Sequence, residues 1–455
     1  MTTPSPARAA PASEGTSPAP SVSLLTATTL AVADMVGIGV FTSLGFQVLG
    51  LPSGFALVAL WVVGGVMALC GALSYAELAT ALPRSGGEYN FLSRIYHPAI
   101  GFLAGWVSAT VGFAAPVALA AMAFGSYFAG AVPGAPPLAL ALALVWIVSL
   151  VHLAGIRHAS TFQNVTTIIK VALILVFIVA GFALGSRTPL SFAPAAGDLG
   201  LIASAPFAIS LVYVMYSYSG WNAVTYIAGE VRDPKRNLPL SVLLAVLIVT
   251  GLYVALNVVF LYTTPVERLA GQLNVAQVAG EHIFGPTGGR IVAALICIGL
   301  VSSVSAMMWI GPRVTMAMGE DLAVLSMFAR RTAGGVPALA VLLQLAVATL
   351  LLLTQSFESV LEFIQFSLTF CSFLAVLGVI VLRFTRPELP RPYRVWAYPA
   401  APLLFLAVSL FMMVHMVRER PAQSLAGFAL MLAGLVVFAL FSKPSPTPAM
   451  ERPSR

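Results

Sequence analysis

The stretch Val32–Phe46, "VADMVGIGVFTSLGF", is apolar enough for a membrane helix but carries residues that such a helix normally avoids. It contains one carboxylate, Asp34, and a Gly-x-Gly pattern, in which Gly37 and Gly39 are separated by a single residue. Glycine weakens a helix and allows the backbone to turn. Two interpretations are therefore open: a close contact between two membrane helices, or a helix that is unwound at its centre.

The rest of the chain is equally apolar. Of its 455 residues, 59% are hydrophobic and 9% are charged, and the mean hydropathy is +0.96. Soluble domains are about 25% charged, so this composition argues against a soluble enzyme. The net charge of +7 is spread over short gaps between apolar runs, which does not indicate a nucleic-acid partner. The cysteines and histidines show no metal-ligand spacing, so we expect no metal and no cofactor.

Twelve stretches are long and apolar enough to cross a lipid bilayer, which requires about 20 residues per helix. They are 24–49, 54–82, 99–130, 137–155, 161–185, 203–228, 239–262, 290–311, 336–354, 357–383, 397–417 and 423–441. The flanking segments 1–23 and 442–455 are rich in Pro, Ala and Ser, which favours disordered tails. The first of them lacks the pattern of a cleaved leader.

The distribution of basic residues predicts the orientation. With alternating loops and both termini on the cytoplasmic side, 17 of the 23 Lys and Arg residues fall on that side and five on the other, while Lys170 lies within a span. Cytoplasmic loops carry an excess of Lys and Arg. We therefore predict a multi-pass protein of the cytoplasmic (inner) membrane with both termini in the cytoplasm.

The sixth span is interrupted in a way that resembles the first. Within "LVYVMYSYSGWNAVTYIAGE" it carries the small-residue cluster Ser217–Gly220 about a dozen residues from one end. The two interrupted spans begin two blocks of five, 24–185 and 203–383, and an odd number of spans places the blocks in opposite orientations. Paired interruptions in inverted halves indicate the central binding site of a transporter. Spans eleven and twelve, 397–441, are then peripheral.

The physical chemistry of the two breaks predicts what binds there. Unwound backbone in a membrane is tolerated where it lines a cavity. A helix that restarts near Gly39 offers free N–H groups and a positive dipole end, which suit a carboxylate. Carbonyls exposed where the preceding segments end, near Met35 and Val36 and near Tyr216 and Ser217, suit an ammonium. Together these groups match the zwitterion of an α-amino acid.

Three stretches resemble the amino acid–polyamine–organocation superfamily, and within it the bacterial permeases related to L-type exchangers. They are "GIGVF" at 37–41, "SYAELATALPRSGGEYNFL" at 74–92 and "YSGWNAVTYIAGEVRDPKRNLP" at 218–239. The resemblance covers about 24–441. It implies an all-α membrane protein with the LeuT-like fold: a 5+5 inverted repeat with broken helices 1 and 6, two peripheral helices, and transport by alternating access.

The resemblance also implies site residues, carried over by position. The family's carboxylate-binding turn matches Gly37, Ile38 and Gly39; Ile38 replaces a frequent serine, so one hydroxyl donor is missing. The family's ammonium-binding carbonyls match Met35, Tyr216 and Ser219 in the first and sixth spans. The aromatic residue that gates the site in the family matches Tyr216, and Tyr218 and Trp221 are further candidates for the pocket.

Lys170 lies within the fifth span, in "NVTTIIKVALILVFIVAG". An ionisable residue inside a membrane is a functional candidate, although a lysine can also extend its charge to the interface. The resemblance places Lys170 where sodium-coupled relatives hold a cation. Its ammonium would then reach the carbonyls of Ala33 or Val36 and the hydroxyls of Ser302 or Ser303. This predicts sodium-independent transport and makes Lys170 a candidate proton carrier.

Three further carboxylates have more than one interpretation. Asp34 is a counter-ion for Lys170, a direct contact for a cationic substrate, or a cap of the broken helix. Glu77 forms a salt bridge within an inner gate or is simply solvated. Glu362, in the tenth span, is a candidate for the outer vestibule.

The sequence as a whole predicts a secondary transporter of neutral L-amino acids, an exchanger or a proton-coupled carrier. A polyamine or cationic amino-acid carrier that uses Asp34 is the alternative. A channel, a non-transporting sensor or a membrane enzyme is less consistent with the motifs. We expect the amino acid and the lipid bilayer as partners, no nucleic acid and no obligatory accessory subunit.

Overall fold

The computed structural model describes residues 22–441, except 84–85, 155–158 and 333–334. Over these residues the chain is helical, with one isolated β-bridge, Val22 with Val231. The helices are α1 Leu24–Met35, α2 Gly39–Gly50, α3 Gly54–Ala81, α4 Gly87–Ile95, α5 Pro98–Val107, α6 Ala114–Ala131, α7 Pro137–Leu153, α8 Ala159–Leu184, α9 Asp198–Ile202, α10 Ala205–Ser217, α11 Pro234–Thr263, α12 Val266–Leu269, α13 Val275–Asp321, α14 Ala338–Leu353, α15 Phe357–Thr385, α16 Ala400–Glu419 and α17 Pro421–Phe441. A π-helical segment, Ser108–Gly112, and two 3₁₀ segments, Ala223–Glu230 and Ala323–Ala329, complete the set.

The prediction of an all-helical, multi-pass membrane protein is confirmed. Seven helices of the described chain are long and apolar enough to span a bilayer, and the bent pair α1–α2 makes eight if it counts as one span. Four shorter apolar helices accompany them: α7, the part of α8 from Ile168 to Leu184, α10 and α14. The exact number of twelve crossings and the 5+5 inverted repeat stay predictions.

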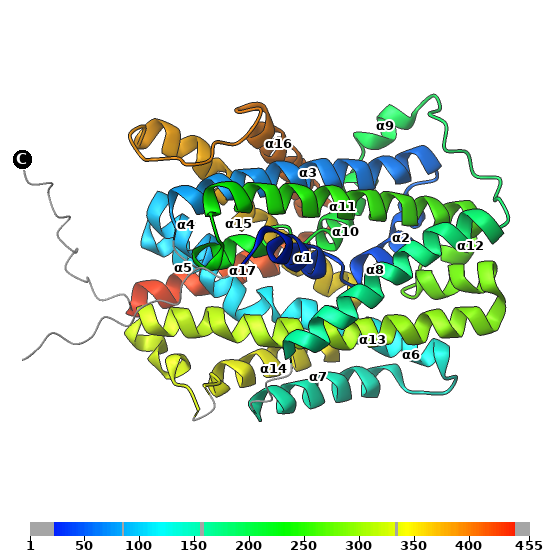
Figure 1. The fold of residues 1–455 in the computed structure, drawn as a ribbon, viewed down its shortest axis with the longest axis horizontal. Helices are drawn as coiled ribbons and strands as arrows, with labels where there is room; N and C mark the ends of the chain where they lie inside the picture. Colours follow the sequence, from blue (N-terminus) through cyan, green and yellow to red (C-terminus); the bar gives the residue numbers. More distant parts are fainter. Residues whose placement is uncertain (1–21, 84–85, 155–158, 333–334, 442–455) are drawn as a thin grey trace, which may run out of the picture.

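The helices lie along the long axis of the molecule (Figure 1). Helices α3 and α11 pack side by side, and α13 packs against α6, α7 and α14 on the other side of the bundle (Figure 1). The broken pair α1–α2 lies between these two groups, where α1 packs against α11 and α2 against α10. Helix α15 contacts both α16 and α17. This arrangement surrounds the interrupted helices with the rest of the bundle.

Both interruptions occur where the sequence predicts them. Helix α1 ends at Met35 and α2 starts at Gly39, with a bend of 41° between them. Helix α10 ends at Ser217, and the chain continues as a turn and then as the 3₁₀ segment that begins at Ala223. Within the turn Gly220 has a φ of +100°, a conformation that favours glycine.

The start of α1 is attached to the segment that precedes α11. Ser23 caps α1 by accepting a hydrogen bond from the N–H of Thr26. The carbonyl of Val22 accepts a hydrogen bond of 2.9 Å from the N–H of Arg232. Val22 and Ser23, which the sequence assigns to the tail 1–23, thus form hydrogen bonds with the helical part of the chain. The remainder of the predicted tails, 1–21 and 442–455, lies outside the described residues.

Several helical segments lie outside the predicted spans, among them α9, α12, α4 and the first part of α13. Helix α4 follows the motif "RSGG", and the first part of α13 precedes the predicted span 290–311. In α13, Gly285 has non-helical dihedral angles (φ 75°, ψ 177°) and marks a kink between this first part and the span. Helix α4 and the first part of α13 are each about ten residues long and contain charged residues, so neither has the length of a membrane span.

Candidate functional site

Helix α2 begins without a capping side chain. Its N-cap residue, Ile38, forms no side-chain cap hydrogen bond, and the first N–H groups of a helix have no partner within the helix. Next to this helix start, Gly37 adjoins open space: a Cβ atom added there would find only the carbonyl oxygen of Met35 within 4 Å, at 3.9 Å. The arrangement provides N–H donors, a positive helix end and room for a ligand.

Gly39 has a different function from Gly37, although only one residue separates them. A Cβ atom at Gly39 would lie 2.4 Å from Oγ and 2.6 Å from Cα of Ser217 at the end of α10. Ser217 Oγ is also 3.0 Å from Ser43 Oγ and donates to the carbonyl of Tyr213 at 2.9 Å. Both interpretations of the Gly-x-Gly pattern therefore apply: Gly39 is a close helix contact, and Gly37 lies at the unwound break.

The carbonyls expected to bind an ammonium are already in use. The carbonyl of Met35 accepts hydrogen bonds from the hydroxyl of Tyr253 at 2.6 Å and from the N–H of Gly37 at 2.7 Å. The carbonyl of Tyr216 accepts them from the N–H of Ser219 at 3.0 Å and from its hydroxyl at 2.6 Å. A carbonyl has two lone pairs, so an ammonium would compete with these internal donors. Ser219 itself is partly exposed.

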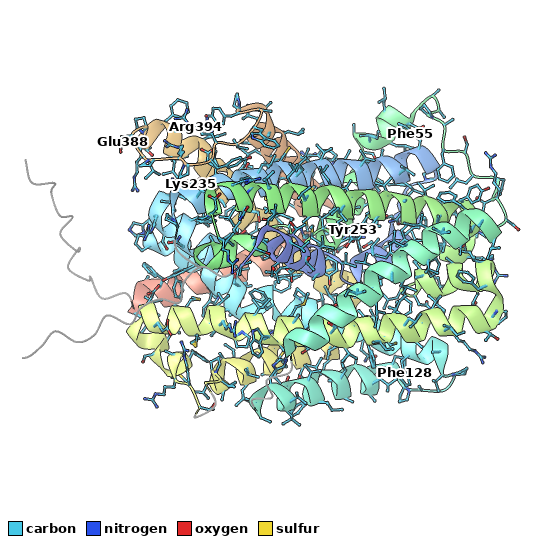
Figure 2. All side chains as sticks on the ribbon, viewed as in Figure 1. Phe55, Phe128, Lys235, Tyr253, Glu388 and Arg394 are labelled. Carbon is cyan, nitrogen blue, oxygen red and sulfur yellow. The ribbon has the colours of Figure 1, made fainter. Side chains whose placement is uncertain are left out.

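Tyr253 is a site residue that the sequence reasoning missed. It lies on α11 near the middle of the bundle (Figure 2) and is fully buried. Its hydroxyl lies between the carbonyls of Met35, at 2.6 Å, and Ser217, at 3.1 Å. Tyr253 therefore contacts the ends of both α1 and α10.

Removal of the Tyr253 hydroxyl tests whether its contacts with the ends of α1 and α10 matter for transport. We expect Tyr253→Phe to reduce uptake about fivefold to tenfold while the protein still folds, because the variant loses a buried hydrogen bond worth about 1 kcal/mol and leaves two carbonyls with one donor fewer. Initial rates of uptake into proteoliposomes and the melting temperature in detergent measure the two effects. Tyr262→Phe, on the same helix, is the matched control; equal rates for both variants would contradict the role of Tyr253.

The ammonium of Lys170 points into the protein. Lys170 is 5% exposed; its Nζ donates to the carbonyl of Val36 at 3.0 Å and to Oγ of Ser303 at 3.1 Å. Two of the four expected contacts are therefore present, and extension of the side chain to the interface is excluded. Ser302, which is fully buried, is next to Ser303 in the sequence, and Ala33 precedes Val36 by three residues.

Asp34 lies against the second break. Its Oδ2 would be 2.6 Å from a Cβ atom placed on Gly220, and Asp34 is partly exposed. It is close enough to Lys170 to interact electrostatically. However, the two described side chains form no ion pair within 4 Å, and Asp34 makes no side-chain hydrogen bond to a described residue. The three interpretations of Asp34 therefore stay open: it interacts with Lys170 electrostatically but without a direct ion pair between the described side chains.

Tyr218 and Trp221 pack against α3. The fully buried Tyr218 donates its hydroxyl to the carbonyl of Trp61 at 3.0 Å. Trp221 packs edge-on against Tyr75, with ring centroids 4.7 Å apart, and also contacts Phe405. These contacts hold the second break against α3 and α16, and the assignment of the two rings to the substrate pocket stays a prediction. Tyr216 is also buried.

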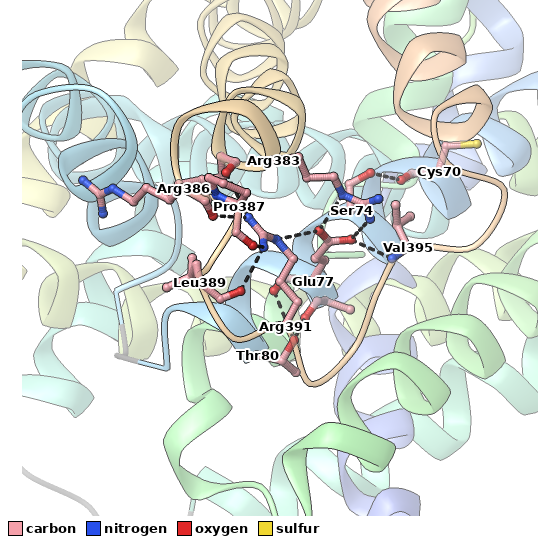
Figure 3. A network of polar contacts seen from close by, with 12 residues as sticks. Cys70, Ser74, Glu77, Thr80, Arg383, Arg386, Pro387, Leu389, Arg391 and Val395 are labelled. Atoms are coloured by element: carbon pink, nitrogen blue, oxygen red, sulfur yellow. Dashed lines mark hydrogen bonds and ion pairs between the residues drawn. The ribbon is translucent and has the colours of Figure 1, made fainter.

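Glu77 joins three segments at one end of the bundle. Figure 3 shows its carboxylate between Arg383 and Arg391. Its two oxygens accept from Arg383 at 2.7 and 3.1 Å and from the N–H of Val395 at 2.7 Å, and one lies 3.7 Å from Arg391. Because Glu77 is only 2% exposed, its interpretation as a solvated carboxylate is wrong. A part in an inner gate stays a prediction.

Glu362 has its own cation at the other end of α15. It is 1% exposed; its Oε1 accepts from Arg420 Nε at 2.9 Å and from the Tyr213 hydroxyl at 3.2 Å. The carboxylate is therefore occupied within the bundle and does not itself line an open vestibule.

The described part of the chain contains no cluster of metal ligands. No group of three or more His, Cys, Asp or Glu side chains lies close enough there to hold a metal ion. Cys70, Cys297 and Cys371 are buried and unpaired.

Comparison with known proteins identifies the family. The profile of the family described as Amino acid permease matches residues 22–441, so the chain belongs to this family, a branch of the superfamily that the motifs resemble. The family and the relatives below are transporters, in agreement with the prediction that the chain is not an enzyme.

The relatives align over most of both chains. Human b(0,+)-type amino acid transporter 1 is 28% identical over 92% of this chain and 87% of its own length. The human Cystine/glutamate transporter is 30% identical over 92% of this chain and 85% of its own length. The Serine/threonine exchanger SteT of Bacillus subtilis is 27% identical over 86% of this chain and 90% of its own length.

Proposed function

We propose that the chain is a sodium-independent secondary transporter of neutral L-amino acids, either an exchanger or a proton-coupled carrier. The observation that carries this proposal is the open space at Gly37 beside the uncapped start of α2. The substrate carboxylate would accept hydrogen bonds from the N–H groups there. Its ammonium would bind the carbonyls at the ends of α1 and α10 in place of the internal donors.

Alternating access requires that the two breaks move together. The hydroxyl of Tyr253 and the contact of Gly39 with Ser217 join them. Movement of the joined pair against the rest of the bundle would open the site first to one side and then to the other. The names of the relatives support an amino-acid substrate, since they include the Cystine/glutamate transporter and the Serine/threonine exchanger SteT. We propose that the chain needs no accessory subunit.

Lys170 supports independence from sodium. Its ammonium takes one carbonyl and one hydroxyl, the kind of oxygen ligands that a hard cation would require. An ammonium at this position would take the place of a sodium ion.

Uptake into sodium-free proteoliposomes tests the proposed function. Labelled L-leucine and L-serine are offered to vesicles that are empty or loaded with unlabelled amino acid. Uptake into loaded vesicles alone would establish exchange, and uptake that follows an imposed proton gradient would establish proton coupling. Uptake that begins only after sodium is added would contradict the proposal.

Asp34 supports a second candidate, a carrier of cationic amino acids or polyamines. The supporting observation is its carboxylate beside Gly220 at the second break, without a hydrogen bond to a described residue. We expect Asp34→Asn to leave uptake of L-leucine within twofold of the original protein if the substrate is neutral. Under the second candidate, uptake of L-lysine falls about tenfold or more, since a buried charge pair contributes at least 1.4 kcal/mol. Competition between labelled leucine and unlabelled lysine distinguishes the two.

A further inference from the structure

A second pocket, of about 270 Å³, lies away from the breaks. It is formed where α2 ends and α10 begins, together with the first turn of α15 and the junction of α16 and α17. Helix α15 extends from this pocket, at Glu358, to the Glu77 cluster, at Arg383. These residues are 25 positions apart, roughly 37 Å of helix, so the pocket and the Glu77 cluster lie at opposite ends of the bundle.

The pocket has a guanidinium group in a fixed position. Arg420 lines it, and Arg420 Nε is held by the buried Glu362 at 2.9 Å. A buried carboxylate without its partner costs several kcal/mol, so Glu362 keeps the guanidinium in place. The Arg420 side chain is 43% exposed, and its terminal nitrogens make no hydrogen bond to a described residue. They remain available to an anionic group.

Two carboxylates line the same pocket. Glu358 and Glu419 are both lining residues. Neither forms an ion pair within 4 Å with a residue that the structure describes, although Glu358 is close enough to Arg420 to interact electrostatically. Together with Glu362, these carboxylates outnumber the single guanidinium of Arg420, so the pocket has an excess of negative charge. This excess attracts a cationic group, and an ammonium with three N–H donors can contact both carboxylates.

Aromatic rings separate this pocket from the breaks. Phe46 stacks on Tyr213, with ring centroids 5.5 Å apart, and on Phe357 at 5.8 Å. Phe46 follows Gly39 by seven residues, about 10 Å along α2. The rings therefore form an apolar wall for the pocket, and the pocket is distinct from the site at Gly37.

We propose that this pocket binds a small zwitterion that carries a primary ammonium beside an anionic group. The anion binds the terminal nitrogens of Arg420, and the ammonium binds Glu358 and Glu419. A free amino acid and the headgroup of an ethanolamine phospholipid share this chemistry. A bound ligand connects α2 and α10, one half of each broken helix, to α15 and α16. The proposal does not depend on the chain being a transporter.

A cysteine reporter tests the proposal. Leu49, at the edge of the pocket, is 63% exposed, whereas all three native cysteines are buried. Leu49→Cys is placed in phosphatidylcholine nanodiscs, and the rate of its modification by a charged thiol reagent is measured. L-leucine at ten times its dissociation constant should slow modification about tenfold. Isopentylamine and 4-methylpentanoate, which each lack one charged group, should protect much less.

A second arm separates the two sources of the ligand. Nanodiscs that contain phosphatidylethanolamine are tested without amino acid; protection there identifies the lipid headgroup, and protection by leucine in phosphatidylcholine identifies the free amino acid. The double change Glu358→Gln with Glu419→Gln should abolish protection in either case. Leu199→Cys, an exposed position on α9, is the control reporter and should show no protection.

One further variant tests whether ligand bound at Gly37 is the cause of the protection. Gly37→Leu fills the open space at the break, and protection of Leu49→Cys should persist in its presence. Three outcomes would overturn the proposal. Protection could disappear with Gly37→Leu, or it could survive the double glutamine change. The third outcome is that neither leucine nor the lipid produces any protection. Failure of uptake in the earlier vesicle experiment does not affect this result.

Discussion

Replacement of Lys170 by alanine is expected to slow amino-acid transport about 100-fold in sodium-free vesicles. The variant loses two hydrogen bonds from a charged donor, those to Val36 and Ser303. Each such bond contributes about 1.5 kcal/mol, and 1.4 kcal/mol corresponds to a factor of ten. The carbonyl of Val36 belongs to the first break, so the loss acts directly on the segment that is proposed to hold the substrate. Initial rates of labelled L-leucine transport measure the effect.

Two controls separate this effect from general damage. Lys235 is exposed at the start of α11, so Lys235→Ala should transport normally. Sodium should partly restore Lys170→Ala, because the variant leaves the oxygen atoms of Val36 and Ser303 without their cation. A folded Lys170→Ala protein with an unchanged rate and no response to sodium would show that the lysine is not part of the transport machinery.

The breaks and Lys170 were predictable because each has a local signal. Clusters of glycine and serine stand out inside apolar spans, and a charge within a span requires a partner. The resemblance then limited the partners of Lys170 to four, of which Val36 and Ser303 are in contact. Local composition and motif thus determined where the helices are interrupted.

Partners that are distant in the sequence were not predictable from the sequence alone. Tyr253 lies in an ordinary apolar span, and its two acceptors are 218 and 36 residues away. Arg420 was assigned only to a loop, because nothing near it indicates its pairing with Glu362, 58 residues away. The direction of Tyr218 and Trp221 depends on how the chain turns at Gly220, which the motif does not encode.

The two glycines of the opening motif are expected to respond differently to the same small change. Gly39→Ala would place a methyl group 2.6 Å from the Cα of Ser217, a backbone atom that only a shift of α10 can move. Such overpacking costs about 1–3 kcal/mol, so we expect a lower melting temperature and a loss of transport.

Gly37→Ala is the matched variant, because its methyl group meets only the carbonyl oxygen of Met35, at 3.9 Å. We expect an unchanged melting temperature but weaker apparent affinity for L-leucine, since the methyl group occupies the space in front of the N–H groups of α2. Thermal unfolding and concentration-dependent uptake, measured on both variants, distinguish packing from binding. A stable, active Gly39→Ala would contradict the close contact with α10, and an unaltered affinity in Gly37→Ala would place the substrate away from the first break. The two variants together show whether Gly39 forms the contact between the broken helices and whether Gly37 lies at the site that these helices form.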